Sequence, residues 1–248
     1  MTFVADSARR SAFGGAPCHR DMALSKRRNK MARDRAPTDN LVIAVDGPAA
    51  SGKGTIARAL AKHFGLPHMD TGLLYRAVAL KLWRWGGDPG NEFETLRACN
   101  DLGFAPDDPE LRSEPVSKIA SRISAYPSVR AALLERQQEF ARQPGGAVLD
   151  GRDIGTVIAP GATVKLFVTA SAEVRAQRRM RELMARGMPA HYDDVLNDIR
   201  SRDERDSGRA VAPLRQAADA ILLDTSEFDV DQAIAEAIRL VEERIAAG

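Results

Sequence analysis

Nine consecutive residues, which begin two positions after the apolar run Leu41–Val45, could bind a triphosphate. They are Gly47, Pro48, Ala49, Ala50, Ser51, Gly52, Lys53, Gly54 and Thr55. Glycines let a loop wrap closely around phosphates, because a Cβ would collide with the phosphate oxygens. The N–H groups of such a loop and the positive N-terminus of the following helix attract anions, and Lys53 can reach the β- and γ-phosphates. The sequence therefore predicts a phosphate-binding loop.

The loop departs from the strict G-x-x-x-x-G-K-[ST] pattern at one position. Gly54 follows Lys53, and the hydroxyl of Thr55 comes one residue later. This hydroxyl therefore lies one residue beyond the position from which the loop usually ligates Mg²⁺. We therefore expect Mg²⁺ to lie mainly on phosphates and water, which this ion tolerates, and we assign it no protein ligand.

Three segments further along the chain combine acids, arginines and glycines. Their ranges are Asp70–Arg76, Asp150–Thr156 and Arg202–Arg209. Arginine is suited to bidentate recognition of phosphate groups. Most of the other arginines between residues 175 and 209 alternate with acids, which is typical of solvated helix faces, and Arg178 and Arg205 are further candidates for a functional role.

Alternating strands and helices must position these segments. Short apolar runs predict five strands, at Leu41–Val45, Leu66–Met69, Ala147–Leu149, Val164–Val168 and Ala220–Leu223. Helical patterns occupy Lys53–Phe64, Leu73–Trp85, Pro127–Gln143 and Val230–Ile245. This order predicts a doubly wound α/β fold with a parallel sheet, whose ligands bind at the carboxyl ends of the strands. Asp46, Asp70 and Asp150 stand at such ends.

The phosphate loop and the three segments together resemble the motifs of bacterial cytidylate kinases. Asp70–Arg76 is similar to their D-[ST]-G-x-x-Y-R, Asp150–Thr156 to D-G-R-D-x-G-T, and Arg202–Arg209 to R-D-x-R-D-x-x-R. The resemblance spans about residues 41 to 245. It implies a P-loop kinase with a five-stranded parallel sheet and helices on both faces. The core would be 41–70, 145–174 and 210–248, with a nucleoside monophosphate (NMP)-binding appendage at about 71–144 and an arginine-bearing lid at about 175–209.

The resemblance also implies an activity and a set of site residues. The activity is Mg²⁺-dependent transfer of the γ-phosphoryl group from ATP to CMP or dCMP. Carried over by motif position, the residues for cytosine are Thr71, Arg130 and Asp153, those for the sugar are Ser121, Arg202 and Asp206, and those for phosphates are Arg76, Arg152 and Arg209. The catalytic charges would be Lys53, Arg152, Arg202, Asp206 and Arg209.

The chemistry of the bases agrees with this allocation. The 4-amino group of cytosine is a donor that a carboxylate such as Asp153 can accept, whereas uracil presents an acceptor there. Transfer between two nucleotides depends mainly on positioning and on electrostatic stabilisation. No general base is evident, although Asp46 or Asp150 could organise metal-bound water. We interpret Tyr75 as a packing residue, because aromatic residues at helical spacing usually pack in a core.

One stretch departs from the family pattern. Between the Asp70 motif and Ser121 the chain is shorter than usual, and residues 104–115 replace a small β-rich insertion. The three prolines of this stretch cannot build a central strand.

Charge separates the first 40 residues from the rest. They hold nine Lys or Arg against four Asp, which gives +5, so the remainder carries 2 − 5 = −3 of the net +2. We expect residues 1–40 to be a disordered basic tail, a transit peptide or a segment upstream of a true start at Met22 or Met31. Two cysteines without metal-type spacing, and no apolar run of membrane-spanning length, predict a cytoplasmic protein. We further expect a monomer without a nucleic-acid or membrane partner.

Three alternative functions make different demands on the sequence. Another kinase of the same fold, such as a UMP/CMP-type enzyme or an adenylate kinase, would differ in acceptor preference, with Asp153 as the discriminating residue. A GTPase switch needs N-K-x-D and D-x-x-G, and the chain has neither. RNA binding through the tail would be strongly salt-dependent and would vanish when residues 1–38 are removed.

Overall fold

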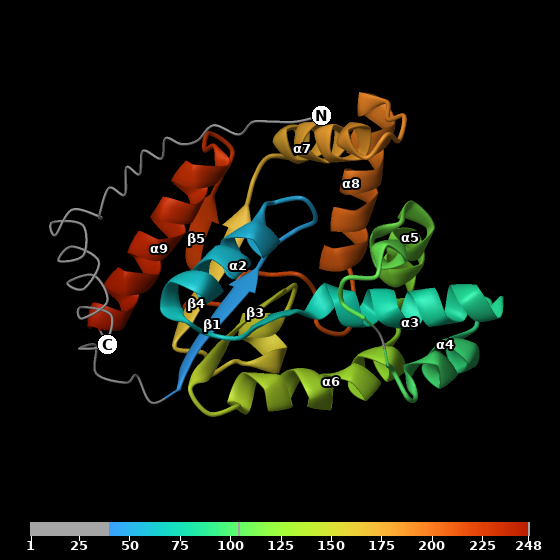
Figure 1. The fold of residues 1–248 in the computed structure, drawn as a ribbon, viewed down its shortest axis with the longest axis horizontal. Coiled ribbons are helices and arrows are strands. Elements are labelled where there is room, and N and C mark those ends of the chain that lie inside the picture. Colours follow the sequence, from blue (N-terminus) through green and yellow to red (C-terminus); the bar gives the residue numbers. More distant parts are fainter. Residues whose placement is uncertain (1–39, 104, 248) are drawn as a thin grey trace, which may run out of the picture. The chain divides into compact units, whose positions relative to one another are not determined.

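The computed structural model describes residues 40–103 and 105–247, and five parallel strands form its centre (Figure 1). The strands are β1 (Leu41–Asp46), β2 (His68–Asp70), β3 (Gly146–Gly151), β4 (Val164–Thr169) and β5 (Ile221–Asp224). Their order in the sheet is β2-β3-β1-β4-β5, and every pairing is parallel. The predicted five-stranded α/β fold is confirmed. β1 and β3 are buried along their whole length, as expected of uninterrupted apolar runs.

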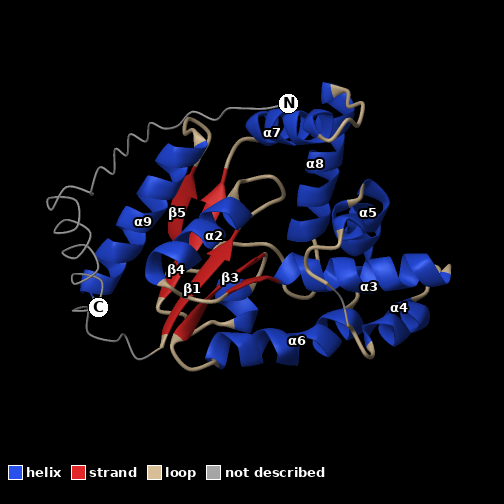
Figure 2. Cartoon of the chain, viewed as in Figure 1, coloured by secondary structure: helices blue, strands red, loops and turns tan. Residues whose placement is uncertain are grey.

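Helices cover both faces of the sheet (Figure 2). Leu41, Ile43 and Val45 point to one face, where they pack with α2 (Lys53–Phe64) and α9 (Val230–Ala247). Val42 and Ala44 point to the other face and pack with residues of α6 (Pro127–Arg142). Because successive side chains of a strand alternate, one apolar run supplies both layers of core.

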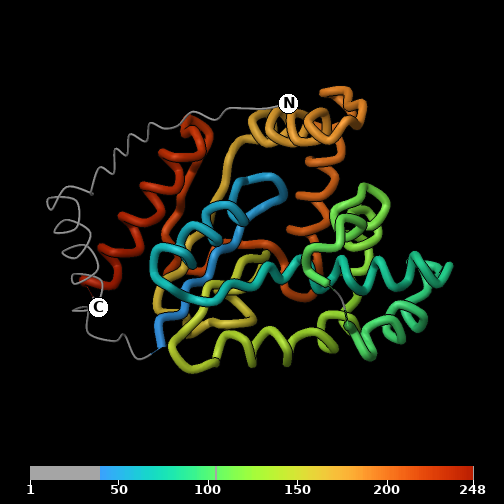
Figure 3. The backbone as a smooth tube through the Cα atoms, viewed as in Figure 1, coloured from blue at the N-terminus to red at the C-terminus, as the bar shows by residue number. Residues whose placement is uncertain are grey.

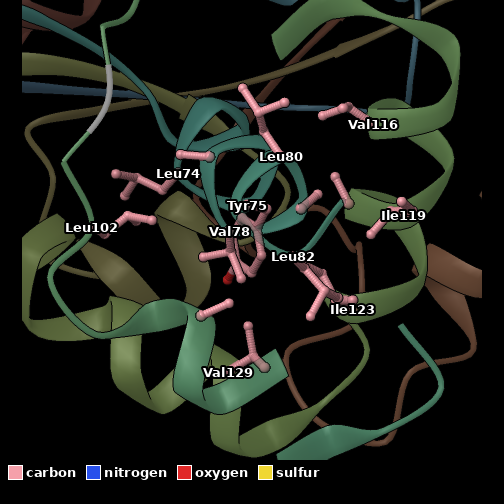
Figure 4. Packing of buried hydrophobic residues seen from close by; sticks show 14 of the residues in the cluster. Leu74, Tyr75, Val78, Leu80, Leu82, Leu102, Val116, Ile119, Ile123 and Val129 are labelled. Carbon is pink, nitrogen blue, oxygen red and sulfur yellow. The ribbon is translucent and has the colours of Figure 1, made fainter. Parts of the chain in front are cut away.

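A group of helices is inserted between β2 and β3. It comprises α3 (Thr71–Trp85), α4 (Glu92–Cys99), the 3₁₀ turn η1 (Pro109–Arg112), α5 (Glu114–Ile123) and α6. Figure 3 follows the chain from β2 through these helices and back along α6 to β3. They enclose a core of their own, in which Leu74, Tyr75 and Leu82 of α3 meet Ile123 of α5 and Val129 of α6 (Figure 4). This core gives the insertion a fixed shape beside the sheet.

The stretch that departs from the family pattern is not a strand in the part that the structure describes. Pro109 begins η1, and Pro115 lies in the first turn of α5, where a missing N–H costs nothing. Phe104 lies outside the described residues, as do residues 1–39 of the predicted basic tail.

Two helices form a hairpin between β4 and β5. They are α7 (Ala172–Ala185), capped by the side chain of Ser171, and α8 (Tyr192–Ser207). Their apolar faces meet through Ala176, Leu183, Val195 and Ile199. Gly187 lies in the connection with φ +73°, a conformation that glycine adopts without strain.

Most element boundaries agree with the sequence prediction, and the differences are local. The second strand is His68–Asp70 instead of Leu66–Met69, because Pro67 cannot donate to a neighbouring strand. The third helix starts at Thr71, not Leu73, since Asp70 already occupies its N-cap position. The helices α4 and α5 were not predicted. No helix of the described residues is long and apolar enough to cross a membrane.

Candidate active site

The loop between β1 and α2 has the backbone that its glycines predict. Gly47 has φ +156°, and a Cβ there would collide with the carbonyl oxygen of Val168 on β4. Gly52 has φ +89° at the N-cap position of α2. The carbonyl oxygen of Ser51 accepts hydrogen bonds from Thr225 Oγ1 at 3.2 Å and Arg178 Nη1 at 3.4 Å. The loop is therefore hydrogen-bonded to α7 and to the segment after β5, and it lies close against β4.

Lys53 is the cation of this loop. Its Nζ donates to the carbonyl oxygen of Pro48 at 3.1 Å. Burial, followed by the nearby charge of Arg152, lowers the pKa of Lys53 to about 7. An anion placed beside Lys53 would therefore stabilise its charged form.

The loop opens into a polar cavity of ≈ 310 Å³ that extends between α3, α5 and α8. The predicted site residues lining it come from every motif of the sequence: Ala49, Ala50, Gly52, Lys53, Gly54, Thr55, Thr71, Arg76, Ser121, Arg130, Arg152, Asp153, Arg202, Asp206 and Arg209. Gly47, Pro48 and Ser51 belong to the loop but do not line the cavity. Segments up to 160 residues apart in sequence, from Ala49 to Arg209, thus meet around one cavity.

In the cavity wall, a buried ion pair lies beside an aromatic ring. Arg130 Nη2 donates to Asp153 Oδ2, and Arg130 Nη1 donates to the carbonyl oxygen of Ser124 at 3.3 Å. The guanidinium carbon of Arg130 lies 5.8 Å from the centroid of the Tyr75 ring. Tyr75 packs in the core of the insertion, as predicted, and its ring also lines the cavity. Thr71 Oγ1 donates to the carbonyl oxygen of Asp150 at 2.8 Å.

Several arginines line the cavity, and most of them have partners. Arg152 Nε donates to Asp206 Oδ2 at 2.8 Å, and Arg209 Nη2 lies 3.5 Å from Asp206 Oδ1. Burial alone would raise the pKa of Asp206, but these two cations hold it below its usual value. Arg76 Nη1 donates to Ser117 Oγ at 2.6 Å, and burial, followed by the charge of Arg202, lowers the pKa of Arg76 to about 10.

Arg202 differs from its neighbours. Its Nε is buried without a hydrogen-bond partner, and the side chain forms no ion pair with a described residue. Burial, followed by the charge of Arg152, lowers its pKa. The charges of Asp198 and Asp206 oppose this shift. A half-buried guanidinium with an unpaired Nε beside a cavity can donate to a ligand with negative charge.

Family membership follows from a sequence comparison. The family model described as cytidylate kinase matches residues 43–243. The chain belongs to the cytidylate kinase family. It is therefore an enzyme of the kinase class, with ATP as co-substrate and small nucleotides as substrates, and not a GTPase switch.

Individual relatives support the assignment to the cytidylate kinases. A cytidylate kinase of Xanthobacter autotrophicus is 60% identical over 206 residues, which cover 82% of this chain and 98% of the relative. The cytidylate kinase of Methylocella silvestris is 55% identical over 203 residues, covering 82% and 94%. Among solved structures, a shikimate kinase from Bacteroides thetaiotaomicron is 13% identical with a TM-score of 0.45, covering 83% of this chain and 98% of the neighbour. So distant a likeness adds nothing to the assignment.

Several residues that line the cavity of this cytidylate kinase family member were not predicted. They include Arg58, Arg112, Ser117 and Arg179. Ser117 lies four residues before Ser121 on α5, so helical spacing could have revealed it. Arg179 Nη2 donates to Glu114 Oε2 at 2.7 Å and so joins α7 to α5. Nothing in the sequence distinguished Arg179 from the other arginines of its helix.

Three acids stand at the carboxyl ends of strands, and two of them have hydrogen-bond partners. Both oxygens of Asp46 accept backbone N–H groups, from Ile154 at 2.8 Å and Gly155 at 2.7 Å. Asp150 Oδ1 lies 2.7 Å from His68 Nε2, and Asp150 also lines the cavity, as does Asp70. No group of three His, Cys, Asp or Glu among the described residues could hold a metal ion.

Proposed function

We propose that this enzyme transfers the γ-phosphoryl group of ATP to CMP or dCMP and so forms CDP or dCDP. One observation carries the proposal. A single cavity is lined by the phosphate loop with its lysine, by the buried Arg130–Asp153 pair and by further arginines. Such a cavity suits two nucleotides whose phosphates meet beside these cations. Membership of the cytidylate kinase family supports the same reaction.

For the acceptor base, we propose that Thr71, Arg130 and Asp153 recognise cytosine. Asp153 is 5% exposed and accepts a hydrogen bond from Arg130, so its carboxylate is held in place at the cavity wall. A carboxylate acceptor favours the 4-amino group of cytosine and disfavours the carbonyl oxygen of uracil. Ser121, Arg202 and Asp206 would hold the sugar.

We propose that four cations stabilise the negative charge of the transferred phosphoryl group: Lys53, Arg152, Arg202 and Arg209. Asp206 would keep the arginines oriented. Arg76 would bind the acceptor phosphate, since Ser117 fixes the direction of its guanidinium group. The chain contributes positioning and fixed positive charge, which is most of what phosphoryl transfer requires.

Mg²⁺ fits this site as an ion held mainly by phosphate oxygens and water. The described residues offer no cluster of protein ligands, and Mg²⁺ at phosphates usually keeps several waters. When bound, the ion would neutralise charge on the phosphates of ATP. Asp70 and Asp150 line the cavity near Lys53. Their carboxylates could accept hydrogen bonds from the waters that Mg²⁺ keeps.

We further propose that residues 71–144 and 175–209 act as the NMP-binding appendage and the lid on the core 41–70, 145–174 and 210–248. The cavity lies between them, and the Arg179–Glu114 ion pair joins α7 to α5. We propose that the enzyme is a monomer and that it acts in the cytoplasm. The free thiol of Cys99 agrees with a reducing compartment.

Replacing Asp153 with asparagine should damage the use of CMP far more than the use of ATP. Asparagine has nearly the same size but no charge, so the cytosine amino group loses its anionic acceptor. We expect kcat/KM for CMP to fall by about a hundredfold, while KM for ATP stays within about threefold of wild type. Steady-state ADP release, with each substrate varied in turn, measures both. An equal loss for both nucleotides would mean that Asp153 serves the fold or the metal.

A further inference from the structure

The turn that carries Asp153 is capped in an unusual way. A π-helical turn, η2 (Ile154–Ile158), follows β3, and Asp153 occupies its N-cap position. An aspartate there normally accepts hydrogen bonds from the first free N–H groups of the turn with its own side chain. The side chain of Asp153 makes no such bond and instead accepts from Arg130.

Asp46 supplies the missing acceptor from a distant strand. Ile154 N donates to Asp46 Oδ1 at 2.8 Å, and Gly155 N donates to Asp46 Oδ2 at 2.7 Å. Asp46 is the last residue of β1 and is 5% exposed. The approach is close, since a Cβ on Gly155 would lie 3.4 Å from Asp46 Oδ2 and 3.1 Å from Lys165 Cδ. One buried carboxylate thus satisfies the two amides that follow Asp153.

We propose that Asp46 is a positioning residue for base selection: it caps the turn in place of Asp153 and so leaves the Asp153 carboxylate free to face Arg130 and the base. The inference rests on the proposed function, in which Asp153 recognises cytosine. Asp46 touches no substrate in this scheme and acts only through Asp153. Without Asp46, two buried amides would lack an acceptor, and the carboxylate of Asp153 is the group placed to replace it.

The charge state of Asp46 adds a second consequence. Burial raises the pKa of Asp46 to about 6, against the opposing effect of the two amide bonds. The charged groups around it are Asp153, which favours protonation, Lys53 of α2, which opposes it, and Lys165 of β4, which packs against Gly155 and pairs with Asp219. A protonated carboxyl carries a donor on one oxygen, so one of the amides loses its acceptor when the pH falls below about 6.

The test compares CMP and UMP as acceptors. Asp46→Asn keeps the size of the side chain but turns an NH₂ group toward one of the two amides. We expect the ratio of kcat/KM for CMP to that for UMP to fall by about tenfold or more, while KM for ATP changes by less than about threefold. Asp219→Asn is the matched control. It breaks the ion pair of Lys165 beside the same turn without touching the amides, so its ratio should equal that of wild type.

Asp153→Asn, measured in parallel, separates the inference from the proposed function. A wild-type ratio in Asp46→Asn together with a lowered ratio in Asp153→Asn would overturn the inference alone. A wild-type ratio in Asp153→Asn would overturn the proposed base reader and the inference with it. If Asp46→Asn does not fold, the wild-type ratio is measured from pH 5.5 to 8. A fall below about pH 6 supports the inference, and a flat ratio overturns it. CMP and UMP carry the same phosphate, so its own titration cancels in the ratio.

Discussion

Replacing Lys53 with alanine is expected to lower kcat by about a hundredfold or more, because a fixed cation beside the transferred phosphoryl group is lost. The fold should survive the change. Lys53 makes one hydrogen bond, to its own loop at Pro48, and burial already opposes its charge. Thermal unfolding should therefore occur at or above the wild-type temperature. Steady-state ADP release at saturating ATP and acceptor gives kcat.

Lys62→Ala is the matched control for the Lys53 variant. Lys62 is an exposed lysine in the last turn of the same helix α2, remote from the cavity, and its removal should leave kcat unchanged. Activity of Lys53→Ala within about threefold of wild type would refute the assignment of the phosphate loop.

Replacing Arg202 with methionine is expected to lower kcat/KM for CMP by about a hundredfold without loss of stability. Arg202 has a buried Nε without a hydrogen-bond partner and forms no ion pair within residues 40–103 and 105–247. Its removal breaks no ion pair within the described residues and relieves repulsion from Arg152, against the lost attraction of Asp198 and Asp206. The melting temperature should therefore stay constant or rise, because burial and repulsion outweigh this attraction and hold the pKa of Arg202 below its usual value. Kinetics and thermal unfolding of the same preparation measure both effects.

Two further arginines make this comparison decisive. Arg200→Met removes an exposed cation from the same helix α8, where it pairs with Glu173, and should change neither activity nor stability. Arg152→Met should lower both activity and stability, because the buried carboxylate of Asp206 loses the hydrogen bond that Arg152 donates. A large drop in the melting temperature of Arg202→Met would mean that Arg202 serves the fold and not a ligand.

The sheet and the loop were predictable because each rests on a local pattern. An uninterrupted apolar run such as Leu41–Val45 can be buried on both faces only in a central parallel strand. The glycines at 47 and 52 predict the backbone of the loop, since Gly47 meets the carbonyl oxygen of Val168 and Gly52 has a positive φ. The roles carried over by motif position fell on residues that line one cavity.

Pairings between distant segments could not be predicted from the sequence. Arg202 and Arg209 have the same residue type and belong to one motif, yet Arg209 lies against Asp206 whereas Arg202 forms no ion pair in the part of the chain that the structure describes. Asp46 gave no sign that it would cap a turn more than 100 residues away. The helices α4 and α5 were missed because Phe93 and Leu96 are exposed and the prolines of the preceding stretch suggested a loop.

The central claim is that this enzyme phosphorylates CMP and dCMP. The most direct test measures ADP release by the purified protein from ATP and Mg²⁺, with CMP, dCMP, UMP, AMP and GMP supplied separately. The structure and the family predict strong turnover with CMP and dCMP, weak turnover with UMP and none with the purine nucleotides. Faster turnover with UMP, AMP or GMP than with CMP, or no turnover with any acceptor, would contradict the claim.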